Sequence, residues 1–148
     1  VEDPNYLDRM HLCDWLDKGN YSVGACGKGV QCPTLAKSKY GFHVRGDTWG
    51  ANRLMDTVMS GTVPIFTAPQ QYDIMPSFVP WKELSYYVNM TNQQTFIESM
   101  EHILSQPESE YQRKSALIEA YQPVFDHRQP HQMDLYLAEF AKRLGVQP

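Results

Sequence analysis

The stretch from residue 41 to residue 66, GFHVRGDTWGANRLMDTVMSGTVPIF, decides the fold that we expect of this chain. Apolar residues alternate over residues 40–44, which is typical of a strand with one buried face. A helical pattern follows over residues 51–60 and stops at Gly61, because glycine readily adopts the left-handed conformation past a helix end. The next run, TVPIFTAP, is too apolar for a half-exposed strand. Two parallel strands joined by a crossover helix are therefore predicted.

The predicted helix over residues 51–60 divides its side chains between two faces. Its apolar face should pack on the core and contains Leu54, Met55, Val58 and Met59, whereas its polar face contains Asn52, Arg53, Asp56 and Thr57. Either Thr48 or Asp47 can cap this helix, because each offers a side-chain oxygen to the first free backbone N–H groups.

Further elements are predicted on both sides of this unit. Before it, we expect a helix over residues 6–18, a short strand entering a glycine-rich loop over 21–29, and one or two helical turns over 31–39. After it come a third strand over 84–90, a helix capped by Thr91, and two more helices over residues 109–125 and 132–144, split by Pro123 and Pro130. The expected fold is α/β, with a Rossmann-like parallel sheet, helices on both faces and a helical C-terminal part. Residues 1–148 should form one domain.

Composition excludes several classes of function. Thirteen Lys and Arg against seventeen Asp and Glu give a net charge of −4, and no basic cluster offers a surface for nucleic acid. The apolar runs are far shorter than the roughly 20 residues that a membrane helix needs, so no membrane segment is expected. His127 and His131 have a metal-like spacing, but Pro130 disfavours a helix through them, and we interpret them as solvated loop residues.

The cysteines lack the spacing of a zinc site or of a Cys-x-x-Cys redox motif. Cys26 and Cys32 can form a local disulfide in an oxidising lumen, leaving Cys13 unpaired, and free thiols are the alternative. Asn20-Tyr21-Ser22 and Asn89-Met90-Thr91 are glycosylation triplets that would suit a secretory compartment, although such triplets also arise by chance.

The predicted binding site lies where the first strand turns into the helix. Ligands of open parallel sheets bind at the carboxyl ends of the strands, where free N–H groups favour phosphate. In the turn from Gly46 to Asn52 the glycines allow close backbone approach, and Thr48 adds a hydroxyl.

Two charged residues of the helix extend this predicted site. Arg53 can bind a diphosphate through its forked guanidinium, and Asp56 can accept hydrogen bonds from a ribose. The alternative is a surface helix on which Arg53 and Asp56 form an ion pair. His43, on the adjacent strand, either contacts a sugar or phosphate or fills a polar gap beneath the helix.

The stretch SKYGFHVRGDTWGANRLMDTVMSGTVPIF resembles the signature of the exostosin-like glycosyltransferases. In that family a strand ends in Gly-Asp and is followed by an Arg-Leu-x-Asp/Glu helix and a Gly-x-x-Pro-Val/Ile strand. The matching positions are Ser38, Phe42, Gly46, Asp47, Arg53, Leu54, Asp56, Gly61, Pro64 and Ile65. Two positions depart from the family: His43 stands where a cysteine or small residue is common, and Thr62 replaces the common cysteine.

The resemblance implies the C-terminal, donor-binding half of a two-domain GT-B glycosyltransferase of the Golgi or another secretory lumen. It implies that Arg53 binds the diphosphate and Asp56 the ribose of a nucleotide sugar such as a UDP- or GDP-sugar, without a metal bridge. The glycan acceptor and the catalytic base would involve an N-terminal domain for which 148 residues leave no room. The alternative function is a non-catalytic α/β ligand-binding or interaction module.

Overall fold

The computed structural model describes residues 7–21, 26, 32–46, 48–50 and 52–146. Its sheet contains three strands in the order β1 (Tyr40–His43), β2 (Val63–Phe66) and β3 (Tyr86–Tyr87). Both neighbouring pairs are parallel, and Phe66 of β2 lies beside His43 of β1 and Tyr87 of β3. Because parallel strands share their direction, all three carboxyl ends meet at one edge of the sheet.

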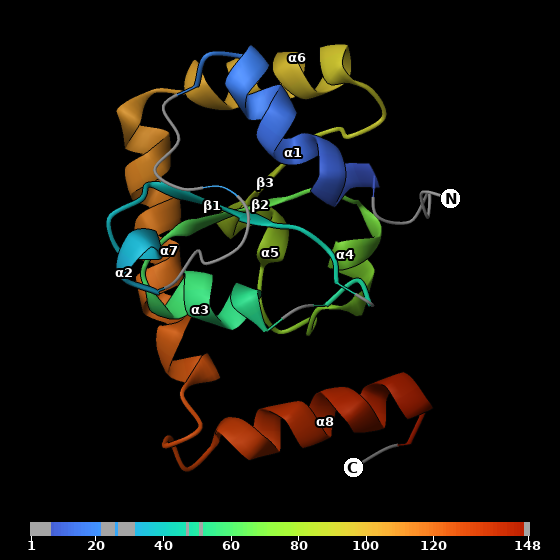
Figure 1. Ribbon diagram of the computed structural model, residues 1–148. Helices are drawn as coiled ribbons and strands as arrows, with labels where there is room; N and C mark the ends of the chain where they lie inside the picture. The colour runs from blue at the N-terminus through green and yellow to red at the C-terminus, as the bar shows by residue number, and fades with distance from the viewer. Residues whose placement is uncertain (1–6, 22–25, 27–31, 47, 51, 147–148) are drawn as a thin grey trace.

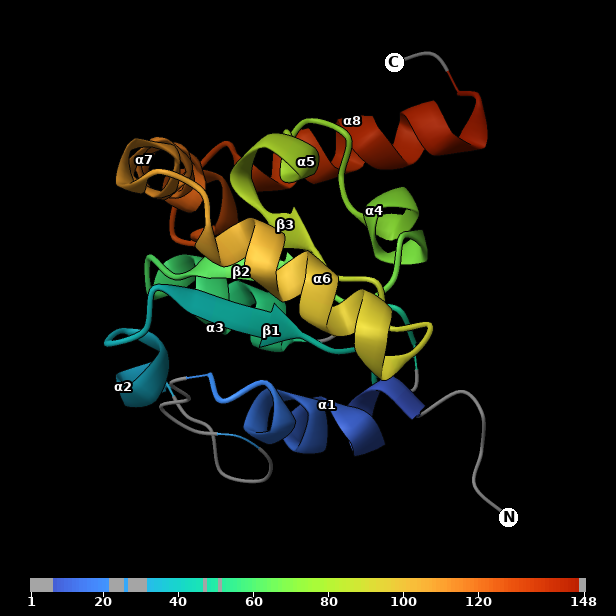
Figure 2. The same ribbon diagram turned by 90° about the horizontal axis from the view of Figure 1, so that it is seen from above.

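Helices cover both faces of this sheet (Figures 1 and 2). One face packs on α1 (Leu7–Lys18) and α6 (Gln93–Leu104) through a core cluster that includes Ile65. The other face packs on α3 (Arg53–Met59), α4 (Gln70–Ile74), α5 (Trp81–Leu84) and α7 (Glu108–Phe125) through a cluster that includes Phe66. The short α2 (Cys32–Leu35) contacts α3. The last helix, α8 (Gln132–Leu144), lies below this body in Figure 1 and has no buried residue among those described.

The central prediction is confirmed: β1 and β2 are parallel neighbours, and α3 forms the connection between them. The predicted opening helix, the helical turn after residue 31 and the third strand are present as well. The α/β class is thus consistent with the structure, with helices on both faces of the sheet. The predicted strand and loop over residues 21–29 lie mostly outside the described residues.

The boundaries and faces of α3 differ from the prediction. The helix begins at Arg53 with Asn52 as its N-cap, so Thr48 lies too far upstream to cap it, and Asp47 lies outside the described residues. Thr57 is fully buried rather than exposed, whereas Met59 is 44% exposed. Burial of Thr57 is tolerated because its hydroxyl donates to the Arg53 carbonyl oxygen at 2.8 Å.

Gly61 ends α3 as expected. It has φ +73°, and its N–H donates to the Val58 carbonyl while that of Thr62 donates to the Thr57 carbonyl. These two bonds form a Schellman motif, which satisfies carbonyls that the helix end leaves free. The motif turns the chain directly into β2, and the prediction from Gly61 is confirmed.

The N-cap predicted for α6 was wrong. The N-cap of α6 is Asn92 rather than Thr91, because Asn92 and Thr95 form a reciprocal capping box. The helix α7 agrees with the helix predicted over residues 109–125 and continues through Pro123 to Phe125. Pro123 lies in the last turn of α7, so little helix remains for it to interrupt.

The suggested pairing of Cys26 with Cys32 was also wrong, as was the alternative that the cysteines are free thiols. Cys13 of α1 forms a disulfide with Cys26, with the two Cα atoms 5.8 Å apart. Proximity in sequence favoured the other pair, but a disulfide requires two Cα atoms at about this separation. The bond links α1 to Cys26, which precedes α2 in the chain.

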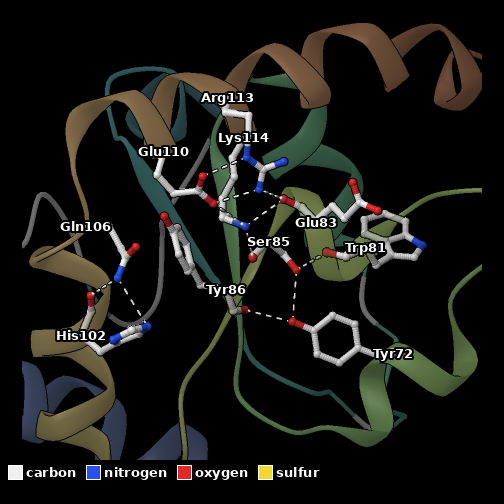
Figure 3. A network of polar contacts seen from close by, with 10 residues as sticks. All are labelled: Tyr72, Trp81, Glu83, Ser85, Tyr86, His102, Gln106, Glu110, Arg113 and Lys114. Carbon is white, nitrogen blue, oxygen red and sulfur yellow. Dashed lines mark hydrogen bonds and ion pairs between the residues drawn. The ribbon is translucent and has the colours of Figure 1, made fainter.

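A polar network joins α7 to the amino end of β3 (Figure 3). Lys114 is buried, and its ammonium donates to the carbonyl oxygens of Glu83 and Ser85 at 2.8 and 2.9 Å. The same ammonium lies 4.5 Å from the ring centre of Tyr86, and burial lowers its pKa. The two hydrogen bonds of the Lys114 ammonium satisfy backbone carbonyls between α5 and β3, so we interpret this group as structural. It lies at the opposite end of β3 from the carboxyl edge of the sheet.

The approach of α3 to β1 depends on Gly41. A Cβ atom at this position would lie 3.0 Å from Cγ2 of Thr57, 3.2 Å from Cδ2 of Leu35 and 3.3 Å from Cγ2 of Thr62. These distances are tighter than ordinary van der Waals contact, and the neighbours belong to three different segments. Any side chain at residue 41 would therefore push α3 and α2 away from the sheet.

We expect Gly41→Ala to destabilise the fold by about 1–3 kcal/mol, because overpacking a close contact costs about this much. Gly46→Ala is the matched control: its Cβ would meet nothing within 4 Å, and its φ is not positive. The control should change stability by less than about 0.5 kcal/mol. Urea unfolding of both variants measures the difference, and equal stabilities would contradict the packing described for Gly41.

Candidate functional site

Gln71 of α4 ties the carboxyl ends of β1 and β2 together. Its side-chain oxygen accepts from the backbone N–H groups of Thr67 and Ala68, both at 2.9 Å. Its amide nitrogen donates to the His43 carbonyl oxygen at 2.8 Å. Gln71 is completely buried, so these bonds fix the edge of the sheet where a ligand of a parallel sheet would bind. No pattern in the sequence indicates this role, because a glutamine in a polar helical segment is ordinarily exposed.

His43, the last residue of β1, is buried with unsatisfied polar atoms. Its exposed fraction is 0%, and neither ring nitrogen has a hydrogen-bond partner among the described residues. Burial lowers its pKa to about 4; the Trp49 backbone lies near enough to oppose this shift but not in hydrogen-bonding geometry, and the charge of Arg53 lowers the pKa further. Its ring packs edge-on against Phe66, 5.3 Å between centres. A buried polar side chain without partners costs stability, which is a feature of functional sites.

The turn after β1 is held by local hydrogen bonds. The Gly46 N–H donates to the Thr48 carbonyl at 3.1 Å, and the Thr48 hydroxyl donates to the Gly50 carbonyl at 2.8 Å. The open space beside Gly46 leaves its backbone accessible. Gly50 has less room, since a Cβ there would lie 3.3 Å from Cδ1 of Ile74. The predicted site residue Asp47 lies outside the described residues.

Arg53 and Asp56 do not form the ion pair of the surface-helix alternative. Both residues are exposed, one turn apart on α3, and neither side chain forms an ion pair or hydrogen bond with another described residue. The Arg53 guanidinium is therefore available to an anion. Because α3 has only seven residues, we attribute little of that capacity to its dipole.

A cleft of about 520 Å³ opens beside Asp56, between α3 and the α7–α8 connection. Its volume is within the range of small-molecule sites. Its apolar wall includes Met55, Met59 and Phe125, and Tyr136 of α8 also lines it. The cation that reaches this cleft, Arg128, is paired with Asp126 at 2.7 Å, and the hydrogen bonds from Arg128 lower the Asp126 pKa to about 2. The free charge on the cleft wall is therefore the Asp56 carboxylate.

The structure thus groups the predicted residues into two adjoining parts. His43, Gly46, Thr48, Asn52 and Arg53 surround the carboxyl end of β1 and the start of α3, whereas Asp56 faces the cleft. Sequence reasoning missed the wall that α7 and α8 contribute to this cleft. His127, predicted to be a solvated loop residue, is exposed and lines the cleft as well.

The described residues contain no group of three or more His, Cys, Asp or Glu that could hold a metal ion. None of the helices in the described part of the chain combines the length and the apolar character that crossing a bilayer requires.

The burial of His43 predicts a pH-dependent stability. In the unfolded chain the His43 side chain takes up a proton near pH 6.5, whereas in the folded chain it stays neutral down to about pH 4. This contribution to stability is therefore complete above pH 6.5 and is lost as the pH falls towards 4, amounting to about 2 kcal/mol between pH 7 and pH 5. Urea unfolding at both pH values measures it. His43→Phe should flatten the dependence, whereas the control His131→Gln, at an exposed histidine, should retain it. An unchanged slope in His43→Phe would contradict the assigned burial.

No protein-family model matches this chain, and no curated protein or solved structure matches it either. A function must therefore be argued from the chemistry of the described residues and from the sequence resemblance.

Proposed function

We propose that this chain is the donor-binding domain of an exostosin-like glycosyltransferase of the Rossmann-like, GT-B type, which binds a nucleotide sugar without a metal. The observation that carries the proposal is the exposed Arg53 guanidinium, which has no partner among the described residues and lies close enough to buried His43 to lower its pKa. A cation left free beside an unsatisfied polar group is suited to an anionic ligand.

The geometry supports a nucleoside diphosphate as the ligand. The diphosphate would lie at the start of α3, where Arg53 can donate two hydrogen bonds and the open backbone at Gly46 allows close approach. Asp56, one turn further along, would accept hydrogen bonds from the ribose. The apolar wall of the adjoining cleft then offers a surface for the base. Arg53, Asp56 and the apolar wall thus follow one another in the same order as the diphosphate, the ribose and the base of the ligand.

In this proposal the domain positions the donor and stabilises its leaving group. Transfer of the sugar leaves a nucleoside diphosphate, and a cation already fixed beside that diphosphate lowers the barrier electrostatically. The glycan or protein-linked acceptor and the catalytic base would come from a second domain. The Cys13–Cys26 disulfide supports a secretory lumen such as the Golgi as the compartment.

One observation favours the alternative of a non-catalytic interaction module. The helix α8 exposes Met133, Leu137, Phe140 and Leu144 at helical spacing, each about 60% exposed. Such a row is typical of a face that packs on another protein surface. A module that only docks on another protein needs no nucleotide, so nucleotide binding is the property that separates the two functions.

We expect Arg53→Ala to weaken binding of uridine or guanosine diphosphate by about 10- to 150-fold, equivalent to about 1.5–3 kcal/mol. Asp56→Asn should weaken the same nucleotides and spare pyrophosphate, because only the ribose contact is lost. Isothermal calorimetry at constant salt measures both ligands, and thermal unfolding checks that each variant remains folded. Lys82→Ala removes an exposed cation on α5, at the amino end of β3 and away from the start of α3, and serves as the control. Nucleotide affinity within twofold of the parent for Arg53→Ala would refute the proposed site.

Chelation tests the proposed independence from metal. If Arg53 neutralises the diphosphate, nucleotide affinity should be the same, within twofold, with excess EDTA and with added Mn²⁺ or Mg²⁺. Loss of binding in EDTA, restored by either ion, would instead indicate a carboxylate–metal site of a different enzyme class.

A further inference from the structure

The triplet Asn89-Met90-Thr91 lies in the connection between β3 and α6. This connection runs along the periphery of the molecule in both views (Figures 1 and 2). Thr91 is exposed, Asn89 is partly exposed, and Met90 packs against the core cluster beneath α6. The backbone of Asn89 is fixed from α6, since its N–H donates to the Ser99 hydroxyl at 3.1 Å and its carbonyl accepts from the Thr95 hydroxyl at 3.1 Å. The triplet therefore lies at the surface, and hydrogen bonds from α6 hold the backbone of Asn89 in place.

The orientation of the Asn89 amide follows from its partners. One side-chain atom faces the Thr91 N–H at 3.0 Å and the Thr91 hydroxyl at 2.6 Å. A backbone N–H can only donate, so the facing atom is the oxygen Oδ1. The nitrogen Nδ2 is then the free end of the amide, and it has no hydrogen-bond partner among the described residues.

The fold does not require the Asn89 nitrogen. The cap of α6 is complete with Asn92 and Thr95, which satisfy each other's backbone N–H groups. The contacts that Asn89 does make use its backbone and Oδ1. A substituent on Nδ2 would therefore break no hydrogen bond of the described structure.

We propose that Asn89 is a site of N-linked glycosylation. Three independent features support this proposal. Two belong to the site itself, namely the Asn-x-Thr acceptor triplet and a surface amide with a free nitrogen, and the third is a disulfide elsewhere in the chain. The disulfide matters because disulfides form in the oxidising compartments where N-linked glycans are added. This inference does not depend on the proposed nucleotide site.

The modification is a group transfer from a lipid-pyrophosphate-linked oligosaccharide. Nδ2 forms a bond to the anomeric carbon of the first sugar, while the bond from that carbon to the pyrophosphate oxygen breaks. The lipid pyrophosphate leaves with the bonding electron pair, and the amide loses one proton to a base of the transferring enzyme. No oxidant or reductant is needed.

The second triplet, Asn20-Tyr21-Ser22, does not carry the same argument. Asn20 is exposed and has φ 54°, just past the end of α1, but Ser22 lies outside the described residues. We therefore commit to Asn89 and use Asn20 as the comparison.

The test is to express the full chain behind a secretory leader in animal cells. The protein is then analysed both from the cells and from the medium. Peptide-N-glycosidase in heavy-oxygen water converts each glycosylated Asn to a labelled Asp, which peptide mass spectrometry locates. The variants are Asn89→Gln and Thr91→Ala, which remove the acceptor, Thr91→Ser, which keeps it, and Asn20→Gln as the matched control. A free-thiol assay on the same samples shows whether Cys13 and Cys26 have paired.

We expect label at residue 89 in the parent, in Thr91→Ser and in Asn20→Gln. In Asn89→Gln and Thr91→Ala the apparent molecular mass on a gel should be lower by about 2 kDa, because the glycan is missing. An unlabelled Asn89 in parent chain whose disulfide has formed would overturn the proposal, because that chain has reached the oxidising lumen. Label confined to Asn20 would overturn it equally.

Discussion

The absence of a side chain at Gly41 is the constraint on which the rest of this structure depends. It allows Thr57 of α3 and Leu35 of α2 to approach β1 more closely than any other residue would permit. With α3 held there, the Schellman motif at Gly61 directs the chain into β2 in parallel register. The positions of His43 at one end of β1 and Arg53 at the start of α3 both follow from this packing.

The candidate site contains a group that is costly to the fold. The ring nitrogens of His43 are buried without a hydrogen-bond partner among the described residues, and an unsatisfied buried polar group costs about 1–3 kcal/mol. Arg53 is exposed, so water solvates its charge, and its side chain has no partner among the described residues. By contrast, Lys114 at the opposite edge of the sheet is buried with two carbonyl partners and stabilises the fold.

The sequence predicted the parallel unit because local signals there agree with the tertiary fold. Alternation in β1, helical spacing in α3 and glycine at its end all indicate the same topology. The faces of α3 could not be predicted, because the burial of Thr57 depends on the small neighbour Gly41. The prediction of the disulfide was wrong for a related reason, since the tertiary fold, and not the spacing in the sequence, brings Cys13 of α1 within bonding distance of Cys26.

The site was predictable only in part. Arg53 and Asp56 emerged from residue type and spacing, and their exposure agrees with that prediction. Gln71 and the cleft wall from α7 and α8 did not, because they reach the site through tertiary packing from distant segments. Such contributions have no periodic signal in a single sequence.

The most direct test of the central claim is to map where a nucleoside diphosphate binds. Titration of uridine diphosphate into the ¹⁵N-labelled chain should shift the backbone amides of Gly46, Thr48, Asn52 and Arg53 most strongly, followed by those lining the cleft beside Asp56. Amides around Lys114, at the other edge of the sheet, should stay unchanged. Shifts centred on that opposite edge, or no shift at millimolar nucleotide, would contradict the claim that the carboxyl ends of β1 and β2 form a nucleotide-sugar site.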